Sequence, residues 1–194
     1  GDYLPEDIGP TEIQGKNGVV DLVCDNEKEA TQVAKNLLGI FQGNLKEFVN
    51  SDQRILRHIV PENRLKVYDM RIIINNLSDS GSVIELRKDF GVGIITSFIR
   101  IGGISFGLIA NDPFILGGAI DAEAGEKAAK FLQLCDNFRL PVISLCDTPG
   151  FMVGPESEKT GAVRRGSLLI EASANLSVPL FTVIVRKGYG LGAQ

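Results

Sequence analysis

The feature that most constrains the fold is an internal repeat near the end of the 194-residue chain. Its two copies are NFRLPVISLCDTPG, which starts at Asn137, and NLSVPLFTVIVRKG, which starts 38 residues later at Asn175. In both copies Pro follows Asn by four residues and Gly follows Pro by nine. Each copy also comes after a segment with helical patterning. A helix, a proline, an apolar strand and a glycine therefore form one supersecondary unit that is used twice.

The strand in each copy is apolar without alternation. Such a run is typical of a strand buried on both faces, which occurs in parallel sheets with helices packed outside them. We therefore predict an α/β fold in which these two strands run parallel and are both buried.

Other patterns predict the elements just before the repeat. Residues 121–138 have an apolar stripe at helical spacing, with Asp121 as a plausible N-cap. The opposite face of this helix should be solvated and holds four charged residues, Glu123, Glu126, Lys127 and Lys130. Residues 91–100 and 104–110 are joined by IGG and predict a hairpin.

The first third of the chain predicts an arm, a helix and a linker. The helix has apolar residues at helical spacing over 30–38, and Gly39 is its expected stop. Residues 44–60 are mostly polar and have no sustained helical or strand periodicity, which predicts a linker and a domain boundary near residue 60. A short helix over 68–77 and a strand over 83–86 should follow.

Composition excludes several classes of partner. A formal net charge of −4 with interspersed signs offers no electrostatic footprint for nucleic acid or an anionic membrane surface. Three cysteines without metal-type spacing fit a reduced, cytoplasmic setting and predict no metal site. The single histidine, His58, lies in a charged connecting stretch, so a Ser-His-Asp triad is not expected. No signal peptide or membrane span is expected, and a start without Met suggests a piece of a longer polypeptide.

Glycines gather where the predicted strands end. The three stretches are NDPFILGGA, DTPGFMVGP and KGYGLGA. In open α/β sheets ligands bind beyond the carboxyl ends of the strands, where glycine lets backbone N–H groups face the ligand. Such loops suit an anion, or a carbonyl oxygen that becomes negative during a reaction.

Two of these stretches resemble nucleotide motifs without satisfying them. GYGLGA matches the dinucleotide pattern G-x-G-x-x-A, but that fingerprint belongs to the opening strand of a domain and needs an acidic residue about twenty positions later, whereas this match follows the last predicted strand. DTPG is similar to a GTPase switch motif, yet the chain has no G-x-x-x-x-G-K-[ST] loop. Nucleotide hydrolysis is therefore not expected.

Simpler interpretations of the same residues stay open. Gly117, Gly118 and Gly150 could each serve only a turn that needs positive φ. The pair Arg164 and Arg165 could be solvated helix charges, or could hold a carboxylate at the start of a helix. In addition, Asp147 could anchor loop backbone, and Tyr189 could pack or donate its hydroxyl.

Several motifs in order resemble the carboxyltransferase component of biotin-dependent acyl-CoA carboxylases, the propionyl-, acetyl- and methylcrotonyl-CoA carboxylase family. They are YDMR, IANDPFILGGAID, KAAKFLQLCDNFRLPVISLCDTPGFMVG, GAVRRGSLL and VPLFTVIVRKGYG. The resemblance covers about residues 61–194 and implies the C-terminal domain of that component, truncated at its C-terminus. Residues 1–43, with GKNGVVDLV, resemble the tail of the N-terminal half, and 44–60 would be the linker.

The resemblance implies a crotonase-like spiral of repeated β-β-α units. It also implies biotin, delivered as carboxybiotin on a carrier protein, an acyl-CoA substrate and no metal. The expected partners are a biotin carboxylase component with its carrier, and further copies of the chain, as dimers within a hexamer-type assembly. The active site of such enzymes lies between opposite domains of two protomers, and this chain would supply the biotin side.

The resemblance also assigns candidate residues. The catalytic oxyanion hole of the family is a Gly-Ala pair, which corresponds to Gly192-Ala193 if Leu191 is an insertion and to Leu191-Gly192 if it is not; Gly190 precedes both. The candidates for holding biotin or substrate are Gly117, Gly118, Gly150, Phe151, Gly154, Arg164, Arg165 and Tyr189. Two alternatives remain for the function, an acyl-CoA decarboxylase component and a non-catalytic interaction module of a carboxylase complex.

Overall fold

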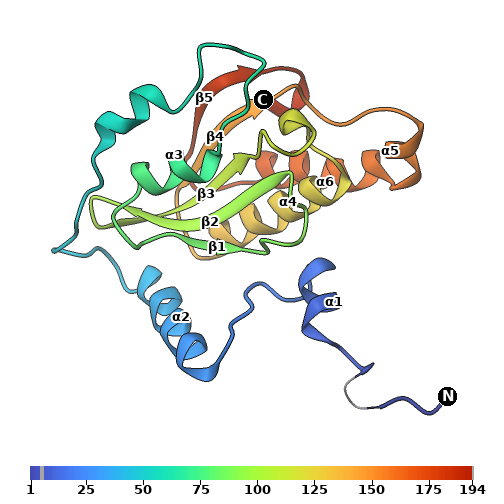
Figure 1. Cartoon of the computed structure of the whole chain (residues 1–194), viewed down its shortest axis with the longest axis horizontal. Helices are drawn as coiled ribbons and strands as arrows, with labels where there is room; N and C mark the ends of the chain where they lie inside the picture. The colour runs from blue at the N-terminus through green and yellow to red at the C-terminus, as the bar shows by residue number, and fades with distance from the viewer. Residues whose placement is uncertain (5–6, 194) are drawn as a thin grey trace.

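A five-stranded mixed sheet organises the computed structural model, which describes residues 1–4 and 7–193 (Figure 1). The first three strands are antiparallel and the last three are parallel. In spatial order, which is also chain order, the strands are β1 (Ile84–Leu86), β2 (Ile94–Ile101), β3 (Ile104–Asn111), β4 (Val142–Thr148) and β5 (Leu180–Gly188). The predicted α/β class and the predicted hairpin, β2 with β3, are both confirmed.

Helices cover both faces of the sheet, as Figure 1 shows. The helical elements are α1 (Thr11–Lys16), α2 (Glu27–Ile40), η2 (Gln53–His58), α3 (Met70–Leu77), η3 (Leu116–Gly118), α4 (Ala122–Asn137), α5 (Pro155–Lys159), α6 (Ala162–Ala174) and η4 (Leu191–Ala193). Within the described ranges, no helix has the length and apolarity needed to cross a membrane.

Strand β2 separates the two halves of the core, because its side chains alternate between the faces of the sheet. Phe98 is 1% exposed and packs with Phe131 and Leu132 of α4 on one face. On the other face Ile95 and Ile99 pack with residues of α3 and with the partly buried Leu56, Ile59 and Val60. Part of the segment predicted to be a linker thus packs against the core.

The internal repeat is a structural repeat. Strands β4 and β5 are parallel, and Val142 pairs with Leu180, 38 residues later. The same offset holds through Cys146 and Ile184, and then a bulge shifts the register so that Thr148 pairs with Gly188. The helices before the two strands pack together closely, since a Cβ added at Gly125 of α4 would lie 3.1 Å from Cα of Gly166 in α6.

The second repeated strand is not buried, and here the prediction from its apolar run is wrong. Phe181, Val183 and Ile184 of β5 are 58, 53 and 62% exposed. The reason is position: β5 is the edge of the sheet, and the described residues do not cover it. An apolar run indicates that a strand is suited to burial, but the described residues of this chain do not cover β5.

Of the two predictions for helix α4, one is confirmed and the other is wrong. Asp121 caps it as predicted, since its side chain accepts a hydrogen bond from the N–H of Ala124 at 2.8 Å. Lys127, however, is 1% exposed and does not lie on a solvated face. The loop around Gly91 covers it, because a Cβ at Gly91 would lie 3.1 Å from Cβ of Lys127.

Helix α2 ends one residue later than predicted, at Ile40, with Phe41 as its C-cap. The guanidinium of Arg100 in β2 donates hydrogen bonds to the carbonyls of Gly39 and Gly43. These bonds attach the end of α2 and the residues just after it to the sheet.

A test of this packing uses Gly107 of β3, where an added Cβ would lie 2.3 Å from Sγ of Cys135 in α4. We expect Gly107→Ala to lower the free energy of unfolding by roughly 1–3 kcal/mol, because overpacking forces the helix away from the strand. Urea unfolding measures this cost. In a Cys135→Ala background most of the cost should disappear; an unchanged cost would show that contact with Cys135 is not its source.

Candidate functional site

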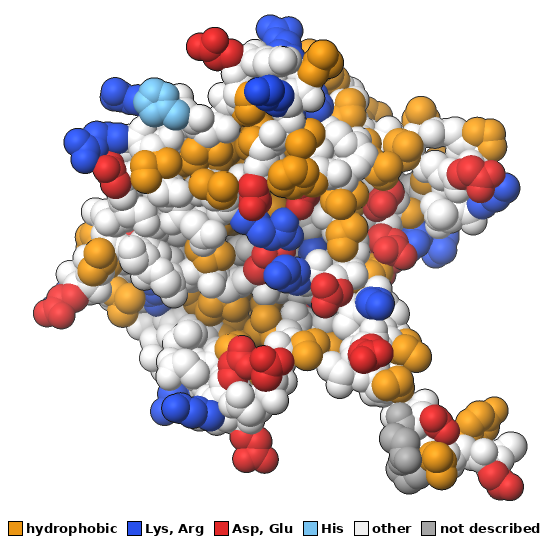
Figure 2. Space-filling view, in the orientation of Figure 1, with side chains coloured by type: hydrophobic (Ala, Val, Ile, Leu, Met, Phe, Trp, Pro, Cys, Tyr) orange, Lys and Arg blue, Asp and Glu red, His pale blue; other side chains and the backbone are white. Residues whose placement is uncertain are grey.

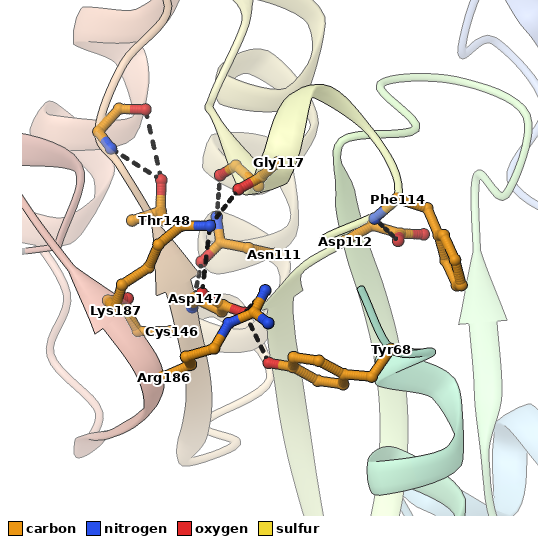
Figure 3. Close-up of polar contacts among 12 residues, drawn as sticks. Tyr68, Asn111, Asp112, Phe114, Gly117, Cys146, Asp147, Thr148, Arg186 and Lys187 are labelled. Atoms are coloured by element: carbon orange, nitrogen blue, oxygen red, sulfur yellow. Dashed lines mark hydrogen bonds and ion pairs between the residues drawn. The ribbon is translucent and has the colours of Figure 1, made fainter. Parts of the chain in front are cut away.

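A buried carboxylate lies at the carboxyl end of β4, among the ends of the parallel strands (Figure 3). Asp147 is 0% exposed, and its Oδ2 accepts a hydrogen bond from the hydroxyl of Tyr68 at 2.7 Å. From β5, Arg186 forms an ion pair with the same oxygen at 3.2 Å, and Nζ of Lys187 lies 3.5 Å from Oδ1. A buried charge needs such partners, so these groups hold the end of β5 and the segment before α3 against β4.

Tyr68 and Arg186 also interact with each other. The guanidinium carbon of Arg186 lies 4.9 Å from the centre of the Tyr68 ring, and its Nη1 donates to the carbonyl of Lys66 at 2.7 Å. Burial, together with the hydrogen bond to Asp147, raises the pKa of the Tyr68 hydroxyl. Tyr68 therefore stays protonated at neutral pH and acts as a donor that orients the carboxylate.

Lys187 links this carboxylate to the glycine loop after β3, residues 111–119, which is called the first loop below. Its Nζ donates to the carbonyl of Gly117 at 2.6 Å, as Figure 3 shows. Asn111 at the end of β3 completes the connection, because its side chain accepts from the N–H of Asp147 at 3.1 Å and donates to the carbonyl of Gly118 at 3.3 Å. Gly117 and Gly118 have φ of 61° and 85°, so the turn itself needs glycine there.

The glycine loops after β4 and after β5 meet beside the first loop. The N–H of Tyr189 donates to the carbonyl of Thr148 at 3.1 Å, and a Cβ at Gly192 would lie 3.2 Å from Cα of Gly150. The N–H of Ile120 donates to the carbonyl of Gly150 at 3.0 Å, and Ile120 forms an isolated parallel bridge with Phe151. The loops after β3, β4 and β5 thus form one continuous surface.

A cavity of about 380 Å³ lies under this surface, between the sheet and α6. Its lining is mostly apolar and includes Phe151, Leu191, Gly192 and Ala193. The size is within the usual range for small-molecule sites. Cys146 also lines it, and burial raises the pKa of its thiol. A protonated thiol is a poor nucleophile, so the arrangement does not favour covalent catalysis by Cys146.

The structure brings together some of the candidate residues and separates others. Gly150, Phe151, Gly190, Gly192 and Ala193 lie at or beside the cavity, and the exposed Tyr189 is in the same loop.

The remaining candidates are occupied elsewhere or lie apart from the cavity lining. Gly154 is the N-cap of α5. Arg164 is exposed, and Arg165 forms an ion pair with Glu126 of α4 at 2.9 Å. This pairing favours a structural role for Arg165 over the capture of a carboxylate.

The terminal loop limits which backbone donors are available. The N–H of Ala193 already donates to the carbonyl of Gly190 at 3.2 Å. This bond favours the pair Leu191-Gly192 over Gly192-Ala193 as a source of free donors. Gly192 belongs to both pairs.

Sequence reasoning assigned no role to Tyr68, Asn111, Arg186 or Lys187. It proposed that Asp147 anchors loop backbone, whereas its carboxylate accepts from side chains and acts on the loop through Lys187. One signal was present: an aspartate at the end of an apolar strand needs cations, and Arg186-Lys187 occupy the corresponding end of the repeated strand.

The glycine loops bring backbone, with few charged side chains, to the edge of the cavity. Among the described residues, no group of three His, Cys, Asp or Glu side chains could hold a metal ion. His58 is exposed on η2 and is pale blue in Figure 2, which also shows charges of both signs among hydrophobic side chains on that face.

Comparison with known proteins agrees with this geometry. The model of the carboxyl transferase domain family matches residues 5–194. The propionyl-CoA carboxylase beta chain of Roseobacter denitrificans is 36% identical over 94% of this chain, and the methylmalonyl-CoA carboxyltransferase 12S subunit of Propionibacterium freudenreichii subsp. shermanii is 35% identical over 95%. In both cases the chain spans 38% of the relative's length.

Solved structures are similar over the whole chain. A single-chain, multi-domain long-chain acyl-CoA carboxylase is 55% identical, with a TM-score of 0.97, and the chain covers 19% of it. The transcarboxylase 12S structure with bound methylmalonyl-coenzyme A and methylmalonic acid is 31% identical, with a TM-score of 0.88 and 39% coverage.

Two adjacent glycines test the construction of the first loop. A Cβ at Gly118 would lie 2.1 Å from the carbonyl oxygen of Asp147, whereas nothing lies within 4 Å of a Cβ at Gly117. We expect Gly118→Ala to lower the free energy of unfolding by at least about 2 kcal/mol, and Gly117→Ala by about 1 kcal/mol for its positive φ alone. Chemical denaturation of both variants measures this, and equal costs would contradict the close approach.

Proposed function

The chain belongs to the carboxyl transferase domain family, and from that premise we propose that it forms the biotin-side half of the active site of an acyl-CoA carboxylase. In this proposal it is the C-terminal domain of the carboxyltransferase component, over residues 61–194, preceded by a linker and by the tail of the N-terminal half. The chain spans 38% of the curated relatives it matches, so the reaction is a property of the complete protein.

The repeated units support a crotonase-like spiral. Strand β4 is followed by the bridge residue Phe151 and then by α6, and β3 is followed by the bridge residue Ile120 and then by α4. Each turn thus contains a long strand, a minimal second strand that pairs with the next turn, and a helix. This order corresponds to a β-β-α unit in which the second strand is reduced to one bridge.

The observation that carries the proposed function is the meeting of the glycine loops over the apolar cavity. Gly150 and Gly192 approach so closely that a side chain on Gly192 would displace the backbone at Gly150. Carboxyl transfer to an acyl-CoA would place negative charge on the thioester oxygen, as the enolate, and on the ureido oxygen of biotin, and fixed N–H donors stabilise such charge without reorganising. Loops that leave no room for side chains present donors of this kind.

Biotin and acyl-CoA have different places in this proposal. The apolar cavity, with Phe151 and the loop 190–193 at its edge, fits an uncharged ring system such as that of biotin. When bound, carboxybiotin would supply the carboxyl group. The N–H of Gly192 would hold the ureido oxygen, and the apolar lining would exclude water. The acyl-CoA would be held mainly by the N-terminal half.

Two alternative functions differ from this proposal. A decarboxylase component would use the same residues in the opposite direction, and no feature of the described residues favours it. A non-catalytic interaction module is disfavoured, because Leu191, the irregular residue of the terminal loop, is 67% exposed and the cavity beside it is open.

The exposed apolar surface supports obligate association. Phe181 and Ile184 of β5, and Val163 of α6, are more than half exposed. We propose that the rest of the polypeptide and further copies of it cover this surface, in addition to a biotin carrier and its biotin carboxylase. The 12S relative forms a hexamer, which agrees with this assembly.

The direct test is Gly192→Val in the complete enzyme. A Cβ at Gly192 would lie 3.0 Å from Cδ1 of Ile120, so a larger side chain must displace the loop or the donor. We expect carboxyl transfer to fall at least about 100-fold, which is the usual effect of losing one oxyanion-hole donor. The assay follows decarboxylation of malonyl-CoA or methylmalonyl-CoA in the presence of free biotin.

The matched control is Gly39→Val in α2, where no atom lies within 4 Å of the added Cβ. This variant should retain activity. Normal turnover by Gly192→Val would refute the oxyanion assignment. Inactivity of the unmodified complete enzyme, despite correct assembly, would refute carboxyl transfer itself and favour the interaction module.

A further inference from the structure

A second cavity, of about 150 Å³, lies on the side of α4 that faces β1. Its lining comes from three parts of the chain and shares no residue with the larger cavity: Asp21 before α2, Leu86, Arg87 and Thr96 of the β1–β2 region, and Lys127, Lys130, Phe131 and Leu134 of α4. Nothing in the proposed carboxyl transfer uses this place.

Lys127 is the most unusual residue of this lining. It is 1% exposed, and its Nζ has no hydrogen-bond partner among the described residues. Burial lowers its pKa to about 8, and the nearby carboxylate of Glu85 offsets only part of this effect. A buried ammonium is costly unless an acceptor lies beside it, so the residue calls for an explanation.

Arg87 is a second cation of this lining, and it has a carboxylate partner in Asp21. Its Nε lies 2.7 Å from Oδ1 of Asp21, yet it is buried and no acceptor among the described residues is aligned with its N–H. Arg87 also has φ of 52°, in the left-handed region that non-glycine residues rarely adopt. Strain of this kind persists where the surroundings require a particular side-chain direction.

The charges around the cavity are unbalanced. Arg87, Lys127 and Lys130 line it, against one acidic residue, Asp21. Lys130 is partly neutralised by Glu126 at 2.8 Å, and Lys127 has no ion-pair partner within the described ranges. Arg87 is paired with Asp21, so among the described residues Lys127 is the cation of this lining that lacks an acceptor, and a negative ligand would supply one.

We propose that the cavity binds a small oxyanion, of phosphate or bicarbonate size, between Lys127 and Arg87. The volume supports this class of ligand: one water occupies about 30 Å³ in the liquid, so about 150 Å³ holds an ion with few waters and excludes most cofactors. An oxyanion offers several acceptors, so it can accept from the unpartnered Nζ of Lys127 and also pair with Arg87, whereas a single water would leave the charge of Lys127 uncompensated.

Binding would add a connection among three segments of the chain. Asp21 precedes α2, Arg87 follows β1 and Lys127 lies in the middle of α4. A shared anion would hold the N-terminal segment and β1 against α4. The site would thus act on the packing of the chain, separately from the glycine loops.

The test uses the full-length polypeptide that contains this chain, exchanged into chloride buffer. Isothermal titration calorimetry with inorganic phosphate, and separately with bicarbonate, measures affinity at constant ionic strength. We expect binding of at least one anion, and Lys127→Met should weaken it roughly tenfold or more, because a charged hydrogen bond is lost. Lys159→Met, which changes an exposed lysine on α5, should leave the affinity unchanged.

Circular dichroism and thermal unfolding show whether Lys127→Met is folded. If that variant does not fold, Arg87→Met takes its place with the same expected loss. Three results would overturn the proposal: no binding of either anion above the chloride control, equal affinity in Lys127→Met, or equal weakening by Lys159→Met. The first result is also expected if an acidic side chain from the rest of the polypeptide fills the cavity.

Discussion

The carboxylate of Asp147 is the group on which the geometry of the candidate site depends. It is completely buried at the carboxyl end of β4, where an ionised group without partners would be strongly destabilising. Tyr68, Arg186 and Lys187 supply the partners from two other segments. Because these donors converge on one carboxylate, they fix the end of β5 and the segment before α3 relative to β4.

The register shift between β4 and β5 makes this convergence possible. The strands pair at a constant offset as far as Cys146, and the bulge that follows displaces Gly188 to a position opposite Thr148. Lys187 can then reach both Asp147 and the carbonyl of Gly117. The loop after β3 and the loop after β5 are therefore oriented by the same ammonium group. A perfect continuation of the repeat would not supply this connection.

The two cavities differ in how they could stabilise negative charge on a ligand. The larger one is apolar and is bordered by loops whose glycines expose backbone, which suits an oxygen whose charge appears only during a reaction. The smaller one is lined by Arg87 and Lys127, whose positive charges at neutral pH do not depend on a reaction. Such charges suit a ligand that is already an anion. In the two proposals, one domain has a site for chemistry and a separate site for a bound anion.

Patterns in the sequence determined the helix–strand repeat, the parallel pairing of its two strands, the hairpin, the N-cap at Asp121 and the positions where glycine loops follow strands. These depend on local periodicity and on backbone freedom, which each segment contains within itself. Tertiary structure decided that β5 is an exposed edge, that Lys127 is buried, and that Lys187 rather than Arg165 serves a loop. Burial and pairing depend on which distant segments arrive at a residue, and no single segment contains that information.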